Sequence, residues 1–180
     1  TVSTSTFIYV DPNVGEDDLA QGSRDVPFKT LEAAMAKAET RPPAVIILGR
    51  SPGIDGPLQL VNGVSIIGGF GGAPLWERSP DITPTILVTT PSANGDIAGV
   101  IAKDITSPTI FRGFSINVSK AGDGGSAYGM IVEDSPRPFL TDLSIEVGGA
   151  GVGADGTPGQ IGAGGAIGDT AGTPNGAPET

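Results

Sequence analysis

The chain has 180 residues and a formal net charge of −10, and it contains neither cysteine nor histidine. Catalysis by a cysteine nucleophile, a histidine base or a Ser-His-Asp triad is therefore excluded, as are the usual zinc sites. Only ten Lys and Arg residues stand against twenty Asp and Glu residues, which argues against nucleic acid as a partner. Glycine and proline are abundant, yet 38% of the residues are hydrophobic, so we expect one turn-rich domain with a real core.

A short β-rich run at residues 7–10 leads into an acidic segment. Carboxylate and amide oxygens are the ligands that Ca²⁺ prefers, so this segment is the candidate calcium site. Its candidate ligands are Asp11, Asn13, Glu16, Asp17 and Asp18. The spaced EF-hand pattern is missing, and a solvated acidic turn without a metal is the alternative.

One of the few helical patterns in the sequence follows, near residues 28–39. Apolar side chains recur at spacings of three and four from Phe28 to Ala38, and the filling is rich in alanine. Thr30 or Asp25 could cap the start of the helix, and Pro42 lies just beyond its end. One helix before an otherwise all-strand chain is expected to cover the open end of a stack of strands.

Short runs rich in Ile, Val and Leu fill the rest of the chain up to residue 148. We predict strands at residues 44–48, 58–60, 64–67, 85–89, 99–102, 109–111, 114–118, 130–132, 139–140 and 143–147. Asn-Gly and Asp-Gly pairs at residues 55–56, 62–63 and 94–95 are typical of hairpin turns. An antiparallel sandwich is therefore the structural alternative to a stack of parallel strands.

A repeat favours the parallel stack. The phrase Val-Ser-Ile at residues 64–66 returns as Phe-Ser-Ile at 114–116 and as Leu-Ser-Ile at 143–145. A short unit of this kind must stack on its own copies to bury its apolar face. Ser115 and Ser144 should then lie in adjacent layers. The predicted inward residues are Ile46, Leu48, Ile66, Leu87, Ile101, Phe114, Ile116, Ile131, Leu143 and Ile145.

Two stretches carry a family resemblance. Residues 7–13 (Phe-Ile-Tyr-Val-Asp-Pro-Asn) and 27–34 (Pro-Phe-Lys-Thr-Leu-Glu-Ala-Ala) resemble the opening of bacterial parallel β-helix proteins of the pectin-lyase-like superfamily. Residues 64–70 are similar to a coil of their surface-exposed members. The resemblance implies an all-β, right-handed parallel β-helix, a solenoid with an N-terminal capping helix. It implies no activity, because enzymes and non-enzymes share this opening.

The C-terminal segment has a different period. Six consecutive triplets begin with glycine from Gly153 onward. A glycine at every third residue suits a collagen-like triple helix or packed polyglycine-like helices, and a flexible linker is the third interpretation. We expect residues 1–148 to form the β-helix with its cap, and residues 149–180 to form a Gly-rich tail or loop. The loop at residues 121–126 should leave the stack at the same corner as this tail.

Three further features bear on chemistry. Asp104 and Asp134 occupy equivalent places in successive copies, where they are either a carboxylate pair or turn residues. Trp76, the only tryptophan, is the candidate glycan-binding residue if its ring is exposed. If the ring instead packs over a strand edge, Arg78 should pair with Glu77 or Asp81. No catalytic residue and no cofactor other than calcium is predicted.

We therefore expect a non-enzymatic structural or adhesive module outside a bacterial cell or on its surface. An open end of the stack should promote a homo-oligomer or filament, with the Gly-rich tail at the contact. The alternative is a carbohydrate-active enzyme, either a polysaccharide lyase or a glycoside hydrolase, or a glycan-binding domain with a polysaccharide partner. No transmembrane segment is predicted. Because the chain opens on polar residues, an exported protein would be present here as a processed form or fragment.

Overall fold

The computed structural model describes residues 5–18, 22–159, 162 and 164. This part of the chain contains one helix, α1 (Leu31–Glu39), and ten strands. The strands are β1 (Thr6–Val10), β2 (Ala44–Leu48), β3 (Ile54–Asp55), β4 (Leu58–Leu60), β5 (Val64–Ile67), β6 (Thr85–Val88), β7 (Ile97–Lys103), β8 (Thr109–Val118), β9 (Ala127–Glu133) and β10 (Pro138–Val147). The two longest strands each join two of the predicted short ones, and β3 is not among the predicted strands.

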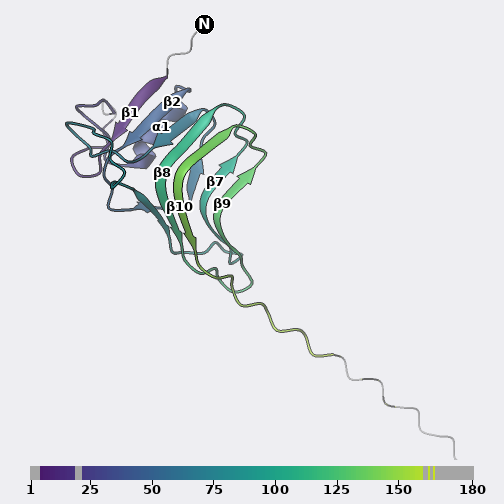
Figure 1. Cartoon of the computed structure of the whole chain (residues 1–180). Coiled ribbons are helices and arrows are strands. Elements are labelled where there is room, and N and C mark those ends of the chain that lie inside the picture. Colours follow the sequence, from purple (N-terminus) through teal and green to yellow (C-terminus); the bar gives the residue numbers. More distant parts are fainter. Residues whose placement is uncertain (1–4, 19–21, 160–161, 163, 165–180) are drawn as a thin grey trace, which may run out of the picture.

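The strands form two curved sheets that face each other (Figure 1). One sheet has the order β1-β2-β5-β8-β6-β3, with β10 added on β8, and the other has the order β4-β7-β9. Every strand pair within the described residues is parallel. The only antiparallel contact there is an isolated bridge between Phe70 and Arg78. The antiparallel sandwich is therefore wrong, and the fold is a mostly parallel β structure with one helix.

The predicted repeat sets the register of the later strands. Ser115 of β8 and Ser144 of β10 are direct Cα partners, so the last two copies of the phrase lie side by side. Val100 of β7 pairs with Met130 of β9 in the same way. The prediction that the two serines lie in adjacent layers is confirmed.

The first copy of the repeat does not share this register. Ile66 pairs with Phe111 of β8, whereas the partner of Ser115 is Thr85 of β6. Strands β5 and β6 thus lie end to end along the single long strand β8, and residues 69–83 leave the sheet between them as an inserted loop. The alignment of residues 64–66 with the later copies is wrong, because the insertion shifts everything after it.

Helix α1 begins at Leu31, later than the pattern predicts. Thr30 is the N-cap and its side chain accepts a hydrogen bond from the N–H of Ala33, so Asp25 does not cap the helix. The helix ends at Glu39, just before the prolines, and packs its buried side chains against β1 and β2. Phe28 lies outside the helix and forms a bridge with Val10 of β1.

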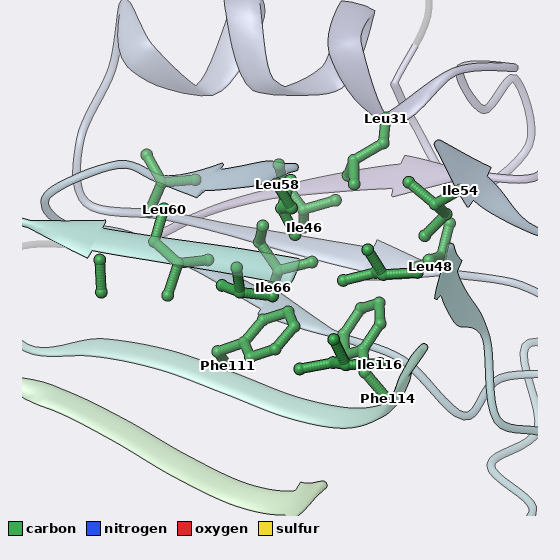
Figure 2. Close-up of a cluster of buried hydrophobic side chains, with 14 of the residues drawn as sticks. Leu31, Ile46, Leu48, Ile54, Leu58, Leu60, Ile66, Phe111, Phe114 and Ile116 are labelled. Carbon is green, nitrogen blue, oxygen red and sulfur yellow. The ribbon is translucent and has the colours of Figure 1, made fainter. Parts of the chain in front are cut away.

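The core lies between the sheets and under α1 (Figure 2). Phe111 and Phe114 are fully buried and their rings stack at 4.5 Å between centroids. The predicted inward residues that are buried are Ile46, Leu48, Ile66, Phe114 and Ile116, and Leu143 packs against them.

Four predicted core residues are corrected. Leu87 is 44% exposed because its neighbours Ile86 and Val88 face inward in β6. Ile101 and Ile131 lie outside the core cluster, because Val100 and Ala102 take the inward positions of β7. The fourth, Ile145, is 48% exposed although it is aligned with the buried Ile116, because no described strand lies beyond β10.

Three glycines face branched side chains of the larger sheet at close range. A Cβ atom on Gly56 would meet Ile86 and Val88, one on Gly99 would overlap Ile116, and one on Gly129 would overlap Ile145. In each layer, a glycine from one side thus accommodates a branched side chain from the other. Any larger residue there must push the sheets apart.

A second set of glycines forms a corner where the turns stack on one another. The N–H of Gly122 donates to the carbonyl of Gly95, and the N–H of Gly151 donates to that of Gly125. Residues 149–152 therefore lie on the loop of residues 121–125, as predicted, and this stacking extends past the expected boundary at residue 148. Most of the Gly-rich tail of residues 149–180 (residues 160–161, 163 and 165–180) lies outside the described residues.

Replacing Gly99 with alanine should test the close approach of the sheets. The added methyl group would lie 2.5 Å from the carbonyl oxygen of Gly129 and would overlap Ile116. Overpacking of this kind costs about 1–3 kcal/mol, to be measured by urea unfolding. Gly53→Ala is the matched control because no atom lies within 4 Å of its Cβ position. Equal stability of the two variants would contradict the packing argument.

Candidate functional site

The inserted loop of residues 69–83 stands over β8 and β10 and leaves a cleft of about 500 Å³ between them. We call this space the loop cleft. It is lined by Gly69, Arg78, Ser79, Pro80, Ile82, Thr83, Arg112, Gly113 and Asp142. Loops that a rigid sheet holds in place are where binding residues are most often found, so this cleft is the first candidate site.

The part of the inserted loop between the bridged residues Phe70 and Arg78 is held by buried groups. Asp11 is 3% exposed, and its carboxylate accepts a hydrogen bond of 2.8 Å from the N–H of Ala73. Trp76 is 7% exposed, donates from Nε1 to the carbonyl of Arg24, and meets the ring of Tyr9 edge to face at 4.9 Å. The Trp76 ring therefore packs over the edge of β1 and is not open to a sugar, so the structure lends no support to glycan binding by this residue.

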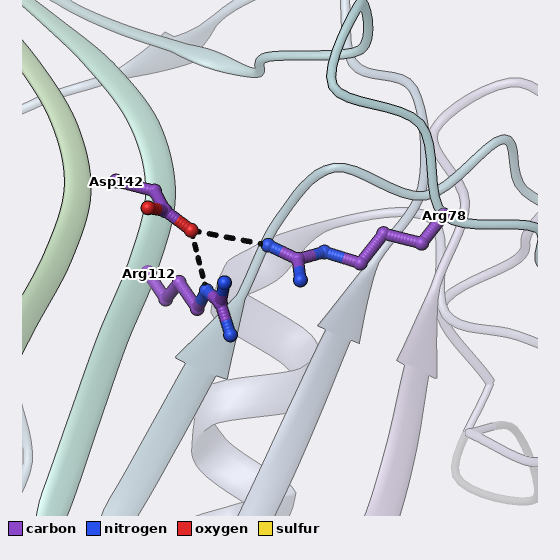
Figure 3. A network of polar contacts seen from close by, with 3 residues as sticks. All are labelled: Arg78, Arg112 and Asp142. Carbon is purple, nitrogen blue, oxygen red and sulfur yellow. Dashed lines mark hydrogen bonds and ion pairs between the residues drawn. The ribbon is translucent and has the colours of Figure 1, made fainter.

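Asp142 joins the loop to the sheet (Figure 3). Its Oδ2 atom accepts a hydrogen bond of 2.6 Å from Nε of Arg112 and one of 3.3 Å from an Nη atom of Arg78. The hydrogen bond from Arg112, together with the charges of both guanidinium groups, lowers the pKa of the Asp142 carboxyl. The expected pairing of Arg78 with Glu77 or Asp81 is wrong, because the loop carries Arg78 over β10.

The strands bend where the cleft forms. Gly113 of β8 has φ = 78°, and Asp142, the aligned residue of β10, has φ = 52°. Both residues thus adopt the left-handed conformation, which glycine and aspartate tolerate better than most residues. The bend interrupts the regular pairing between Thr141 and Leu143 and places the Asp142 carboxylate beside Arg112.

Two of the candidate calcium ligands, Asp11 and Asp17, accept hydrogen bonds from backbone N–H groups. Asp11 accepts from the N–H groups of Asn13 and Ala73, and Asp17 accepts from those of Lys29 and Thr30. Burial raises the pKa of Asp17, but the hydrogen bonds from Thr30 and Lys29 outweigh this effect and lower it. Glu16 and Asp18 are exposed. The described residues contain no group of three acidic side chains arranged to hold a metal.

Asp104 and Asp134 both occupy turns. Each is exposed and adopts the left-handed conformation, with φ values of 56° and 47°. Their neighbours Lys103 and Glu133 form an ion pair of 3.2 Å across the two layers, which raises the pKa of Lys103. The turn interpretation therefore explains both aspartates.

Sequence reasoning missed an apolar row on the outer face of the larger sheet. Four of its positions are apolar, and the buried Ser65 of β5 interrupts it; the row crosses five strands at residues Phe7, Val45, Ser65, Ile110 and Phe139. Phe7 and Phe139 are 57% and 56% exposed, and Phe139 lines a hollow of about 670 Å³ beside Asn62 and Ser65. The sequence signal that could have revealed this row is the alternation of inward and outward residues along each strand. The outward positions are themselves apolar, so they could not be told from core positions.

No family model matches the sequence, and no curated protein or solved structure is significantly similar to it. Within the described residues, no helix has the length and apolar character that crossing a membrane requires.

Titration of Asp142 should test the ion pairs in the loop cleft. We expect a carboxyl pKa below the ordinary value of 3.8, measured by the pH dependence of its ¹³C shift. Arg112→Gln should move it back toward 3.8, whereas Arg41→Gln, which removes an exposed charge elsewhere, should not. Because the folded-state pKa is lowered, the stabilisation is complete above pH 3.8 and is lost as the pH falls through the lowered value. An unshifted pKa in the unchanged protein would contradict the contacts described.

Proposed function

We propose that the chain is a right-handed parallel β-helix that serves as a non-enzymatic structural or adhesive module outside a bacterial cell or on its surface. The parallel pairing of β8 with β10 and of β7 with β9, each in the register of the sequence repeat, supports the β-helix. Right-handed connections are the rule for parallel strands in one sheet, which supports the handedness. The structural role rests on the uncovered end of the stack.

The observation that carries this proposal is the contrast between the two ends. At the first end, α1 covers the core, and β1 exchanges hydrogen bonds with Gly22 and Phe28. At the other end, β9 and β10 are the last described strands of their sheets. Ile145 and Val147, which point at Gly129, are 48% and 40% exposed there. Unpaired strand edges beside apolar side chains favour pairing with another chain.

We infer that a second copy of this chain covers the open end. The described part of the tail leads away from the sheets (Figure 1), and a Cβ atom at Gly153, Gly156 or Gly159 would meet nothing within 4 Å. The covered first end does not offer a free edge for head-to-tail stacking. Two open ends can instead pair across a two-fold axis, with each β10 antiparallel to its copy.

A lysine at the open end should weaken this association. Ile145→Lys places a charge at the proposed contact, whereas Leu87→Lys places one on an equally exposed apolar residue of the outer face. We expect the unchanged protein and Leu87→Lys to show a concentration-dependent mass in sedimentation experiments, and Ile145→Lys to stay monomeric. A monomeric unchanged protein at all concentrations would remove the proposal.

Removing residues 153–180 should show whether the tail or the open end forms the contact between two copies. This deletion keeps residues 149–152, whose backbone pairs with the loop at 121–125. If the strand edges drive association, the truncated protein should dimerise as the full chain does. Loss of the dimer would instead place the Gly-rich tail at the contact.

A glycan-binding role is the second candidate, because the outer row presents Phe139 beside polar groups in a hollow. We expect acidic and neutral polysaccharides to yield neither new reducing ends nor unsaturated products when incubated with the protein and Ca²⁺. Product formation would overturn the non-enzymatic assignment. Polysaccharide binding that Phe139→Ala abolishes and Phe7→Ala leaves intact would favour the second candidate.

A further inference from the structure

We propose that the loop cleft binds a singly charged tetrahedral oxyanion, such as a sulfate half-ester or a phosphodiester on a larger ligand. The charge of the cleft supports an anion. Its lining contains two arginines and one aspartate, a local charge of +1 on a chain whose net charge is −10. A single negative charge would balance the site, whereas the rest of the surface repels anions.

Both guanidinium groups have N–H donors that Asp142 does not use. Arg112 uses Nε and Arg78 uses one Nη atom toward Asp142, which leaves both Nη atoms of Arg112 and the second Nη atom of Arg78 without a partner among the described residues. The two side chains are 40% and 43% exposed, so a ligand can reach them. Each arginine has five N–H donors, and the fork at its tip suits the oxygens of sulfate and phosphate groups.

The two guanidinium groups approach one point from different sides. Arg112 reaches the carboxylate from β8, and Arg78 reaches the same oxygen from the inserted loop on another side (Figure 3). A sulfate half-ester has three free oxygens and a phosphodiester has two, so either group can accept hydrogen bonds from both forks at once. The hydroxyl-bearing residues Ser79 and Thr83 also line the cleft and add neutral donors.

Asp142 positions the two arginines and also competes with the anion for their N–H donors. Its carboxylate keeps the two arginines close together. The hydrogen bond that Arg112 donates to Asp142 restricts the conformations of the Arg112 side chain. The same carboxylate also offsets one positive charge. Asp142→Asn should therefore raise the local charge to +2 while preserving the left-handed backbone, which asparagine tolerates.

The test uses the full ¹⁵N-labelled chain titrated with sodium methyl sulfate and with sodium dimethyl phosphate, at constant ionic strength maintained with NaCl. Amide shifts of Gly113 and Thr83 report on the cleft. We expect saturable shifts with one or both anions, which identifies sulfate or phosphate as the source. Arg112→Gln should weaken binding by about tenfold, because charge-assisted hydrogen bonds are the strong ones. Arg41→Gln, the matched loss of one charge, should leave binding unchanged.

The sign of the Asp142→Asn effect separates a binding site from a purely structural ion pair. Tighter anion binding by this variant supports the proposal, and it does so even where Arg112→Gln fails to fold. Unchanged or weaker binding by Asp142→Asn overturns it, as does equal weakening by Arg112→Gln and Arg41→Gln. Sodium acetate that binds as tightly as methyl sulfate would overturn the tetrahedral assignment.

Discussion

The close approach of the two sheets is the constraint on which the rest of this structure depends. Gly99 and Gly129 leave room for Ile116 and Ile145, so each layer has the same narrow width. Since the backbone must return to this contact in every layer, the length of the repeat is nearly constant in the later strands. Residues inserted between two strands therefore cannot enter the core and must form a loop on the outside of the sheet.

The inserted loop of residues 69–83 follows from this constraint. It leaves the sheet between β5 and β6, while Gly68 and Pro84 stay against β8 so that the strand line continues. Buried Asp11 and Trp76 then hold the part of the loop between Phe70 and Arg78, and Asp142 holds Arg78 itself. The loop is therefore a fixed wall of the cleft, which is the condition for a defined binding geometry.

Two surfaces of different chemistry result. The loop cleft is charged and small, and its arginines offer directional hydrogen bonds. The open end is apolar and presents whole strand edges, whose backbone groups suit another strand. The two surfaces share β10, because Asp142 of that strand lines the cleft while the edge of the same strand belongs to the open end.

Sequence reasoning succeeded where a local pattern carries the information. The helix near Leu31, the positions of the strands and the equivalence of Ser115 and Ser144 follow from periodicity and repeat spacing. It failed at Ile101 and Ile131, because consecutive apolar residues leave the phase of a strand open. The failure at Leu87 has the same cause. The apolar row on the outer face was missed for this reason too, since its exposed apolar residues could not be told from core residues.

The sequence by itself thus determined the repeat that favours parallel stacking and the helix over the first end, since these depend on short-range pattern and on repetition. Only the tertiary structure decided what the charged and aromatic side chains do. Trp76 is buried because the inserted loop folds back onto β1, and Arg78 meets the distant Asp142 for the same reason. Such contacts depend on where an irregular loop comes to rest, which no local pattern encodes.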